Sequence, residues 1–276
     1  MPFSGSSTAD EVLAGVDLNG TVVVVTGATS GLGNGLVEAF TRHGATVVPA
    51  ARSVGTGGVP LDLASLASVR EAAAAILEHH DRVDLLMNNA GVMAVPEGRS
   101  AEGFELQMAT NHLGHFLLTA LLAPAFTART RVVNTSSLGH HITGIHWDDP
   151  HFRTTPYEKW TAYGQSKTAN VLFATGLAAH GIHAHSVHPG AIDTSLTRHL
   201  PSEELEFVAA ASASELRTVE QGIAGLLWAA TAPGLRPGSY ISDCAETAPA
   251  AHAADPEDAA RLWAWSEAEV GQAFPA

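Results

Sequence analysis

The segment Tyr163-Gly-Gln-Ser-Lys167 places a phenol and an ammonium four positions apart, in a stretch whose pattern is typical of a helix. Side chains at positions i and i+4 of a helix lie on one face. A cation beside a tyrosine stabilises the phenolate, so the spacing predicts a Tyr163 pKa below the usual value of about 10. Such a phenol could exchange a proton near neutral pH. The alternative is a buried tyrosine and an unrelated surface lysine, since both residue types are common.

A glycine-rich turn follows the first predicted strand, residues 21–26, and opens a predicted helix, residues 31–43. It reads Thr26-Gly-Ala-Thr-Ser-Gly-Leu-Gly33. Glycine lets the backbone approach a ligand closely, and a helix N-terminus attracts anions. The turn therefore predicts a site for the pyrophosphate of a dinucleotide, with a purely structural turn as the alternative. Its candidate binding residues are Gly27, Thr29, Ser30, Gly31, Leu32 and Gly33.

Arg52 follows the second predicted strand, where an acidic residue would bind the ribose hydroxyls of NAD. A cation there suits a 2′-phosphate, so we predict NADP(H) rather than NAD(H); the alternative is a solvent-facing arginine. Asp62 ends a short third strand and, with Leu63 beside it, is a candidate for binding adenine, or it begins a turn. Residues 53–58 are too few for the usual crossover helix. They predict a minimal third strand or a crossover with almost no helix, at a flexible edge.

Short apolar runs alternate with helical patterns along the chain, which is typical of a parallel sheet. The predicted strands cover residues 21–26, 45–50, 59–61, 83–87, 131–135, 183–187 and 239–242. The predicted helices cover residues 31–43, 65–78, 101–126, 157–180, 219–230 and 256–270. We predict an α/β fold: a single doubly wound Rossmann-type domain, with a parallel sheet of about seven strands and helices on both faces. The domain would span residues 18–276, after an N-terminal extension at residues 1–17.

Composition limits the partners. The 276 residues are 46% hydrophobic, enough for one large core, and the net charge of -14 argues against nucleic acid and against acidic membrane surfaces. The longest apolar stretch, residues 116–126, is too short to span a bilayer, and residues 1–17 do not resemble a signal peptide. The single cysteine, Cys244, fits a reducing compartment, so we expect a cytoplasmic protein without a membrane anchor. The histidines lack partners at zinc spacing, so no metal site is predicted.

Further motifs complete a family pattern. Asn88-Asn-Ala-Gly91, Asn111 and Ser137 precede Tyr163 and Lys167 in that order. From about residue 18 to 270 the chain resembles the short-chain dehydrogenase/reductase family. Segments similar to its retinol-dehydrogenase-like and WW-domain-oxidoreductase-like branch are residues 110–116, 133–137, 169–173, 188–190 and 242–244. Only the catalytic domain of such relatives is matched.

The resemblance implies roles for these residues. Tyr163 would be the general acid or base, and Lys167 would bind the nicotinamide ribose and lower the Tyr163 pKa. Ser137 would bind the substrate oxygen, with Ser136 as the competing candidate. Asn111 would hold a water relay behind Lys167, or merely make a polar contact that kinks its helix. Pro189, Gly190, Ile192 and Thr194 would clamp the nicotinamide carboxamide. Other expected cofactor contacts are Asn89, Ala90, Gly91, Tyr163 and Lys167.

The implied function is hydride transfer between NADP(H) and a ketone, an aldehyde or an alcohol, with an apolar small molecule as substrate. Ser137 and Tyr163 lie 26 positions apart, and the long gap points to residues 140–160 as one wall of the substrate site. Residues 195–215 would form another, and the aromatic and apolar candidates in the two segments are Trp147, Phe152, Trp160, Leu205 and Phe207.

Two other functions fit the same scaffold: a catalytically silent NADP-binding redox sensor, and a reductase of a pigment-like ring double bond. Relatives commonly pair through the helices that correspond to residues 101–126 and 157–180. A homodimer, a homotetramer and a monomer are all compatible with the sequence.

Overall fold

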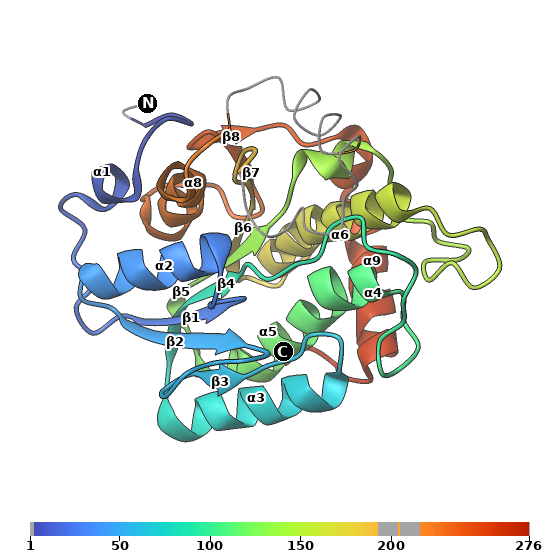
Figure 1. Cartoon of the computed structure of the whole chain (residues 1–276), viewed down its shortest axis with the longest axis horizontal. Coiled ribbons are helices and arrows are strands. Elements are labelled where there is room, and N and C mark those ends of the chain that lie inside the picture. Colours follow the sequence, from blue (N-terminus) through green and yellow to red (C-terminus); the bar gives the residue numbers. More distant parts are fainter. Residues whose placement is uncertain (1–2, 193–203, 205–215, 276) are drawn as a thin grey trace.

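The computed structural model describes residues 3–192, 204 and 216–275, and its centre is an eight-stranded sheet (Figure 1). The strand order is β3-β2-β1-β4-β5-β6-β7-β8. In chain order the strands are β1 Val22–Thr26, β2 Thr46–Ala51, β3 Val59–Pro60, β4 Val83–Asn88, β5 Phe126–Thr135, β6 His183–His188, β7 Tyr240–Ser242 and β8 Ala245–Thr247. The order reverses beside β1, which is where doubly wound sheets bind their ligands.

Helices cover both faces of the sheet, as the sequence predicts (Figure 1). One face carries α1 Ala9–Leu13, α2 Gly31–Arg42 and α8 Val219–Thr231. The other face carries α3 Leu66–His79, α4 Leu106–Met108, the π-helical η1 Ala109–Leu113, α5 Gly114–Leu122 and α6 Lys159–Ala179. α9 Pro256–Val270 packs on α6, and short 3-10 turns form η2 Ala123–Ala125, η3 Leu138–His141 and η5 Ala251–Ala253. Three valines of β1, Val23, Val24 and Val25, are fully buried, as expected for a strand covered on both sides.

The eighth strand was not predicted. β8 pairs antiparallel with β7, while the other seven strands are parallel to their neighbours. The two strands are joined by Asp243 and Cys244, which both have a φ of 54°. Tight hairpin turns with positive φ at two residues are usually marked by Asn-Gly or Asp-Gly. An Asp-Cys pair carries no such mark, so the sequence pattern ended the sheet one strand early.

The predicted helix at residues 101–126 is wrong at both ends. Helix begins at Leu106, because the buried Glu105 carboxylate accepts hydrogen bonds from the first backbone N–H groups of α4, and Gly103 turns the chain at a φ of 84°. The middle is a π-helical turn, Ala109–Leu113. At the other end β5 already starts at Phe126, where residues 127–129 are exposed and therefore give no apolar run.

The crossover after Arg52 combines the two predicted alternatives. β3 has only two residues, Val59–Pro60, and residues 52–58 contain no helix.

Residues 3–17 pack onto the domain. Ala9 and Leu13 are fully buried in the core beneath α8, and Arg42 of α2 pairs with Asp10 at 2.8 Å.

Four histidines are buried in the fold without an acidic partner. His112 bonds to Ser266 Oγ at 2.8 Å, and His185 bonds to Ser239 Oγ at 2.9 Å. Desolvation lowers the pKa of His112 to about 3 and the pKa values of His115, His140 and His185 to about 4. All four are therefore neutral in the native protein at pH values where the unfolded chain protonates them.

We predict that the protein loses stability as the pH falls from about 6.5 toward 4. Each folded pKa is below the unfolded value of about 6.5, so the unfolded chain binds more protons in this window. Each of the four groups then removes about 1.4 kcal/mol of unfolding free energy per pH unit. Glu105 acts in the opposite direction because burial raises its pKa, but it is one group against four. Urea unfolding at pH 7, 6 and 5 tests this, and an unfolding free energy that does not change with pH would contradict it.

Candidate active site

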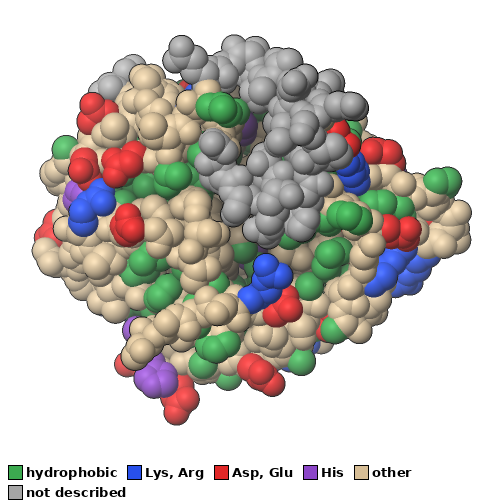
Figure 2. Space-filling model, in the orientation of Figure 1, with side chains coloured by type: hydrophobic (Ala, Val, Ile, Leu, Met, Phe, Trp, Pro, Cys, Tyr) green, Lys and Arg blue, Asp and Glu red, His purple; other side chains and the backbone are tan. Residues whose placement is uncertain are grey.

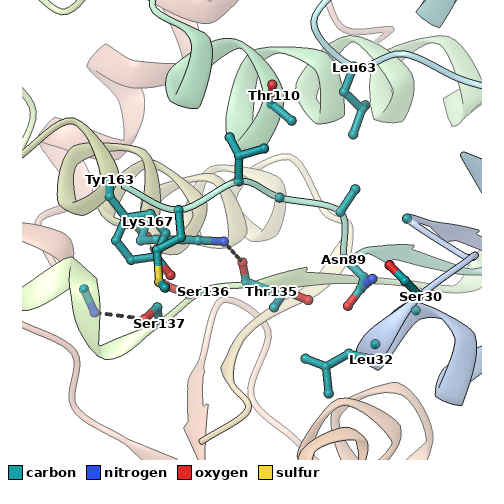
Figure 3. Close-up of a pocket in the computed structure, with 18 of the residues that line it drawn as sticks. Ser30, Leu32, Leu63, Asn89, Thr110, Thr135, Ser136, Ser137, Tyr163 and Lys167 are labelled. Carbon is teal, nitrogen blue, oxygen red and sulfur yellow. Dashed lines mark hydrogen bonds between the residues drawn. The ribbon is translucent and has the colours of Figure 1, made fainter. Parts of the chain in front are cut away.

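A cavity of about 1510 Å³ opens at the carboxyl ends of the central strands. It brings together most residues predicted from the sequence. The predicted residues that line it are Gly27, Thr29, Ser30, Gly31, Leu32, Gly33, Arg52, Asp62, Leu63, Asn89, Ala90, Gly91, Ser137, Tyr163, Lys167, Pro189, Gly190 and Ile192. Asn111 lies behind the cavity wall, and Thr194 lies outside the described residues. Figure 3 shows how the central side chains face one another.

The glycine turn leaves no room for side chains. A Cβ at Gly33 would lie 2.1 Å from the Gly27 carbonyl oxygen, and a Cβ at Gly27 would lie 2.9 Å from Ala90 Cα. Gly27 also has a φ of 67°, which favours glycine. The turn therefore packs closely on itself and on the loop after β4. Residues 31–33 at the start of α2 line the cavity, where a helix N-terminus favours an anion. This shape fits the pyrophosphate of a dinucleotide.

Arg52 and Asp62 lie at the exposed end of the cavity that β2 and β3 form. Asp62 Oδ1 accepts a hydrogen bond from Ala64 N at 3.0 Å, so this residue does begin a turn. It lines the cavity as well, so the two alternatives for Asp62 are compatible. Arg52 is exposed and forms no salt bridge with another described residue.

Two segments of the chain hold the three residues predicted to be catalytic, Ser137, Tyr163 and Lys167. Ser137 follows β5 and caps η3, where its Oγ accepts a hydrogen bond from Gly139 N at 3.1 Å. Tyr163 and Lys167 project from one face of α6, each about 4% exposed. Lys167 Nζ donates to the Thr135 carbonyl oxygen at 3.0 Å and lies 5.7 Å from the centre of the Tyr163 ring (Figure 3).

The sequence predicts that Lys167 lowers the Tyr163 pKa. This prediction is wrong when only the charges of the protein itself are considered. Burial raises the pKa of Tyr163 to about 12, and only the Ser137 hydroxyl opposes this, although the firm hydrogen bond of Ser137 is to Gly139. Lys167 lies beside the ring and points its ammonium toward the Thr135 carbonyl oxygen. Burial also lowers the pKa of Lys167 to about 8. Desolvation therefore outweighs the attraction that the spacing suggested.

Ser136 and Ser137 have different partners. Ser136 is 2% exposed, and its Oγ donates to the Lys167 carbonyl oxygen at 3.0 Å. This bond ties the end of β5 to α6. Ser137 is partly exposed and lines the cavity, and its Oγ accepts the bond from Gly139 N (Figure 3). The geometry favours Ser137 as the residue that meets a ligand.

Asn111 uses its side chain within the protein. Its Oδ1 accepts from Val92 N at 2.8 Å, and its Nδ2 donates to Val92 O at 3.0 Å and to Ser166 Oγ at 2.9 Å. Its carbonyl oxygen faces His115 Nδ1 at 3.0 Å, inside the π-helical turn η1. The residue thus pins the loop after β4 to η1 and α6. These bonds are the polar contact at a helix irregularity that the sequence allowed, and the water relay behind Lys167 stays a prediction.

The long gap before Tyr163 contributes one aromatic side chain to the cavity. Trp160 lines it and meets the Tyr163 ring edge to face at 6.3 Å. Trp147 instead stacks with the Arg261 guanidinium, and Phe152 is buried against Tyr157. Leu205, Phe207 and the rest of residues 195–215 lie outside the described residues, except Glu204.

Ile142 lines the cavity from within residues 140–160, the predicted wall of the substrate site. Apolar lining residues that the sequence analysis missed include Met93, Leu138 and Leu216. Leu138, Ile142 and Leu216 are 44%, 50% and 60% exposed and are the exposed large hydrophobic side chains of the described chain. Leu138 could have been found, because it directly follows Ser137. Met93 and Leu216 reach the cavity from separate loops, for which the sequence offers no periodic signal.

Two further properties concern the described residues alone. None of their helices combines the length and apolar character needed to cross a bilayer. Their His, Cys, Asp and Glu side chains form no group of three arranged to hold a metal ion. On the face drawn in Figure 2, the basic side chains of the described residues lie in small separate groups.

Comparison with known proteins agrees with this geometry. Residues 21–149 match the family model described as short chain dehydrogenase. The chain is 36% identical to human retinol dehydrogenase 13 over 93% of its own length and 86% of that protein. A structure of a putative uncharacterized protein from Mycobacterium Paratuberculosis is 33% identical, covers 100% of both chains and has a TM-score of 0.78. The Pseudomonas aeruginosa RhlG/NADP complex is 26% identical over 82% of this chain and 95% of that one, with a TM-score of 0.63.

Fold, site and relatives together define a dehydrogenase/reductase with a nicotinamide cofactor. The chain belongs to the short-chain dehydrogenase/reductase family, and within it the chain is retinol-dehydrogenase-like.

Proposed function

We propose that the protein is an NADP(H)-dependent oxidoreductase that interconverts an apolar ketone or aldehyde with its alcohol, using Tyr163 as general acid and base. The observation that carries this proposal is that Ser137, Tyr163 and Lys167 line the same cavity as the glycine turn. Bound nicotinamide would supply the hydride or, in the oxidative direction, take it up. The chain's own residues would then control the proton and the position of the substrate oxygen.

The buried phenol is in the correct state for reduction. With a pKa near 12, Tyr163 carries its proton at neutral pH and can donate it from Oη to the substrate oxygen. The carbonyl becomes an alcohol and Tyr163 becomes a phenolate. Lys167, whose pKa is about 8, is mostly charged at pH 7 and stabilises that phenolate from one helical turn away. The Ser137 hydroxyl would hold the substrate oxygen near Tyr163.

We predict that the protein oxidises NADPH in the dark with a simple apolar ketone or aldehyde. Tyr163→Phe should lower kcat by about 10²- to 10⁴-fold, because it removes the proton donor. Ser137→Ala should lower kcat by about 10²-fold, because it removes a donor to the substrate oxygen. Ser136→Ala is the matched serine control and should lose less than about tenfold, since Ser136 Oγ bonds to the backbone. The measurement is the loss of NADPH absorbance.

The same assay separates the two other functions. A redox sensor would bind NADPH without turnover on any carbonyl of the panel, and Tyr163→Phe would then change nothing. A reductase of a pigment-like double bond would leave simple ketones untouched in the dark. Either result would contradict the proposed carbonyl chemistry.

The preference for NADP(H) depends on Arg52. It is exposed at the far end of the cavity from Tyr163, at the carboxyl end of β2. A guanidinium suits a phosphate through paired N–H donors. The NADP complex of a relative that is 26% identical supports the same cofactor.

We predict that Arg52→Ala raises the Kd for NADPH by about 10- to 100-fold, the loss expected for hydrogen bonds to a charged group. The Kd for NADH should change less than about threefold, because NADH has no 2′-phosphate. Titration of both cofactors by fluorescence measures the two values. Arg129→Ala is the control, since Arg129 is exposed and does not line the cavity. Equal losses for the two cofactors would rule out the role of Arg52.

The substrate side of the cavity is apolar. Leu138, Ile142 and Leu216 are exposed there, and Trp160 lies beside Tyr163. Large exposed apolar side chains gathered at one opening mark a surface that a ligand covers. This supports an apolar substrate, with the reacting oxygen at Tyr163.

We infer a monomer, because α9 occupies the outer side of α6. Trp263 of α9 stacks on His180 with 3.8 Å between ring centres, and a Cβ at Gly176 would lie 2.8 Å from its indole. Among the described residues, the large exposed hydrophobic side chains lie at the cavity and not on α5 or α6. Pairing through these helices would have to displace α9.

Light scattering should therefore give a mass of 28.6 kDa. Because α9 covers this face of α6 within the same chain at every protein concentration, the mass should not rise when the protein is concentrated. A stable species of twice that mass would contradict the inference.

A further inference from the structure

We propose that Gln107 is a positioning residue that fixes the Tyr163 phenol from two sides. The proposal rests on the acid and base role of Tyr163 proposed above. Gln107 belongs to α4, is fully buried, and does not line the cavity. Nothing in its sequence position marks it, yet its amide joins two segments that meet at Tyr163.

The first segment is the loop after β4. Ala94 N donates to Gln107 Oε1 at 2.8 Å. Ala94 has a φ of 46°, which is unfavourable for a residue with a Cβ, so this backbone must be held by its surroundings. Met93 and Ala94 form an apolar cluster with Tyr163, against which Trp160 also packs. The Gln107 acceptor thus sets where the loop meets the Tyr163 ring.

The second segment is the start of α6. Gln107 Nε2 donates to the Lys159 carbonyl oxygen at 2.8 Å and to Tyr157 Oη at 2.9 Å. Lys159 is the first residue of α6, and Tyr163 follows one turn later. Tyr157 Oη in turn donates to the Val95 carbonyl oxygen at 3.0 Å, next to Ala94. The one amide therefore ties the helix that carries Tyr163 to the loop that packs on it.

Glutamine suits this position because it offers an acceptor and two donors from a neutral group. A leucine would fill a similar volume but leave the Ala94 N–H unpaired. It would also remove the side-chain bond to the Lys159 carbonyl oxygen, which would keep only its bond within α6. The loop and the helix could then move apart. A displacement of the order of 1 Å in reacting groups is enough to lower a rate by about 10²-fold.

The test is Gln107→Leu in the NADPH assay. We expect kcat per folded molecule to fall at least about tenfold, because Tyr163 is misplaced. The KM for NADPH should stay within about threefold, because the glycine turn is untouched. The loosened packing should also admit water to the phenol. Since burial raises the Tyr163 pKa, the alkaline limb of the kcat profile in the reductive direction should move to lower pH.

A matched control separates positioning from lost stability. His185→Leu removes another fully buried polar side chain, which bonds to Ser239 Oγ at 2.9 Å and does not line the cavity. It should lower the thermal midpoint but leave kcat within about twofold and its pH profile in place. If Gln107→Leu does not fold, Gln107→Asn replaces it. Asparagine keeps a buried amide but is one methylene shorter, so it cannot bond to both Ala94 N and the Lys159 carbonyl oxygen, and kcat should still fall.

Unchanged kcat and pH profile in the folded variant would overturn the role of Gln107, provided that Tyr163→Phe is inactive. An inactive wild type, or a fully active Tyr163→Phe, would instead show that the proposed function has failed. The two failures are therefore distinguishable in one set of assays.

Discussion

The hydroxyl group of Thr26 is the contact on which the site depends. At the end of β1, its Oγ1 accepts hydrogen bonds from Asn89 N at 2.9 Å and from Ala90 N at 3.0 Å, and it faces His115 Nε2 at 2.8 Å. Its backbone oxygen accepts from Asn89 Nδ2. One residue thus joins the glycine turn, the loop after β4 and α5. Thr26 itself is fully buried, so losing its hydroxyl would leave backbone N–H groups of this loop without a partner.

From this contact the loop after β4 runs to the catalytic side of the cavity, held at successive points by buried side chains. Asn111 pairs with Val92, and Gln107 pairs with Ala94. Both belong to the irregular helical stretch from α4 to η1, where the helix widens into a π-turn. Such turns often occur at functional sites. Here the change of helical form brings two amide side chains in succession onto one loop.

Burial determines the electrostatics of the proposed catalytic pair. Tyr163 and Lys167 are both withdrawn from water, which disfavours the phenolate and the ammonium alike. Their pKa values therefore move apart: that of Tyr163 rises from 10.0 to about 12, and that of Lys167 falls from 10.5 to about 8. A phenol that keeps its proton and a lysine that is still charged near neutral pH form a pair suited to donating a proton. The packing of α6, which carries both residues, offsets the free-energy cost of withdrawing the two side chains from water.

Elements with complete local signals could be predicted to the residue. α9 runs from Pro256 to Val270 as expected, because Asp255 caps it, proline stands at its first position and Gly271 ends it in the left-handed conformation. β8 and the start of α4 could not be predicted from the sequence, because an Asp-Cys turn and a buried glutamate cap lack such local signals. Gln107 was not found either, because its partners lie 13, 50 and 52 positions away.

The sequence by itself determined the alternating strands and helices, the glycine turn, and the presence of Ser137, Tyr163 and Lys167, because each depends on neighbours within a few positions. Only the tertiary structure decided the direction of the Tyr163 pKa, the different partners of Ser136 and Ser137, and the internal use of Asn111. The physical reason is that desolvation and hydrogen-bond partners come from segments far apart in the chain. Spacing along a helix can place two side chains on one face, but the water that surrounds them is removed by the rest of the fold.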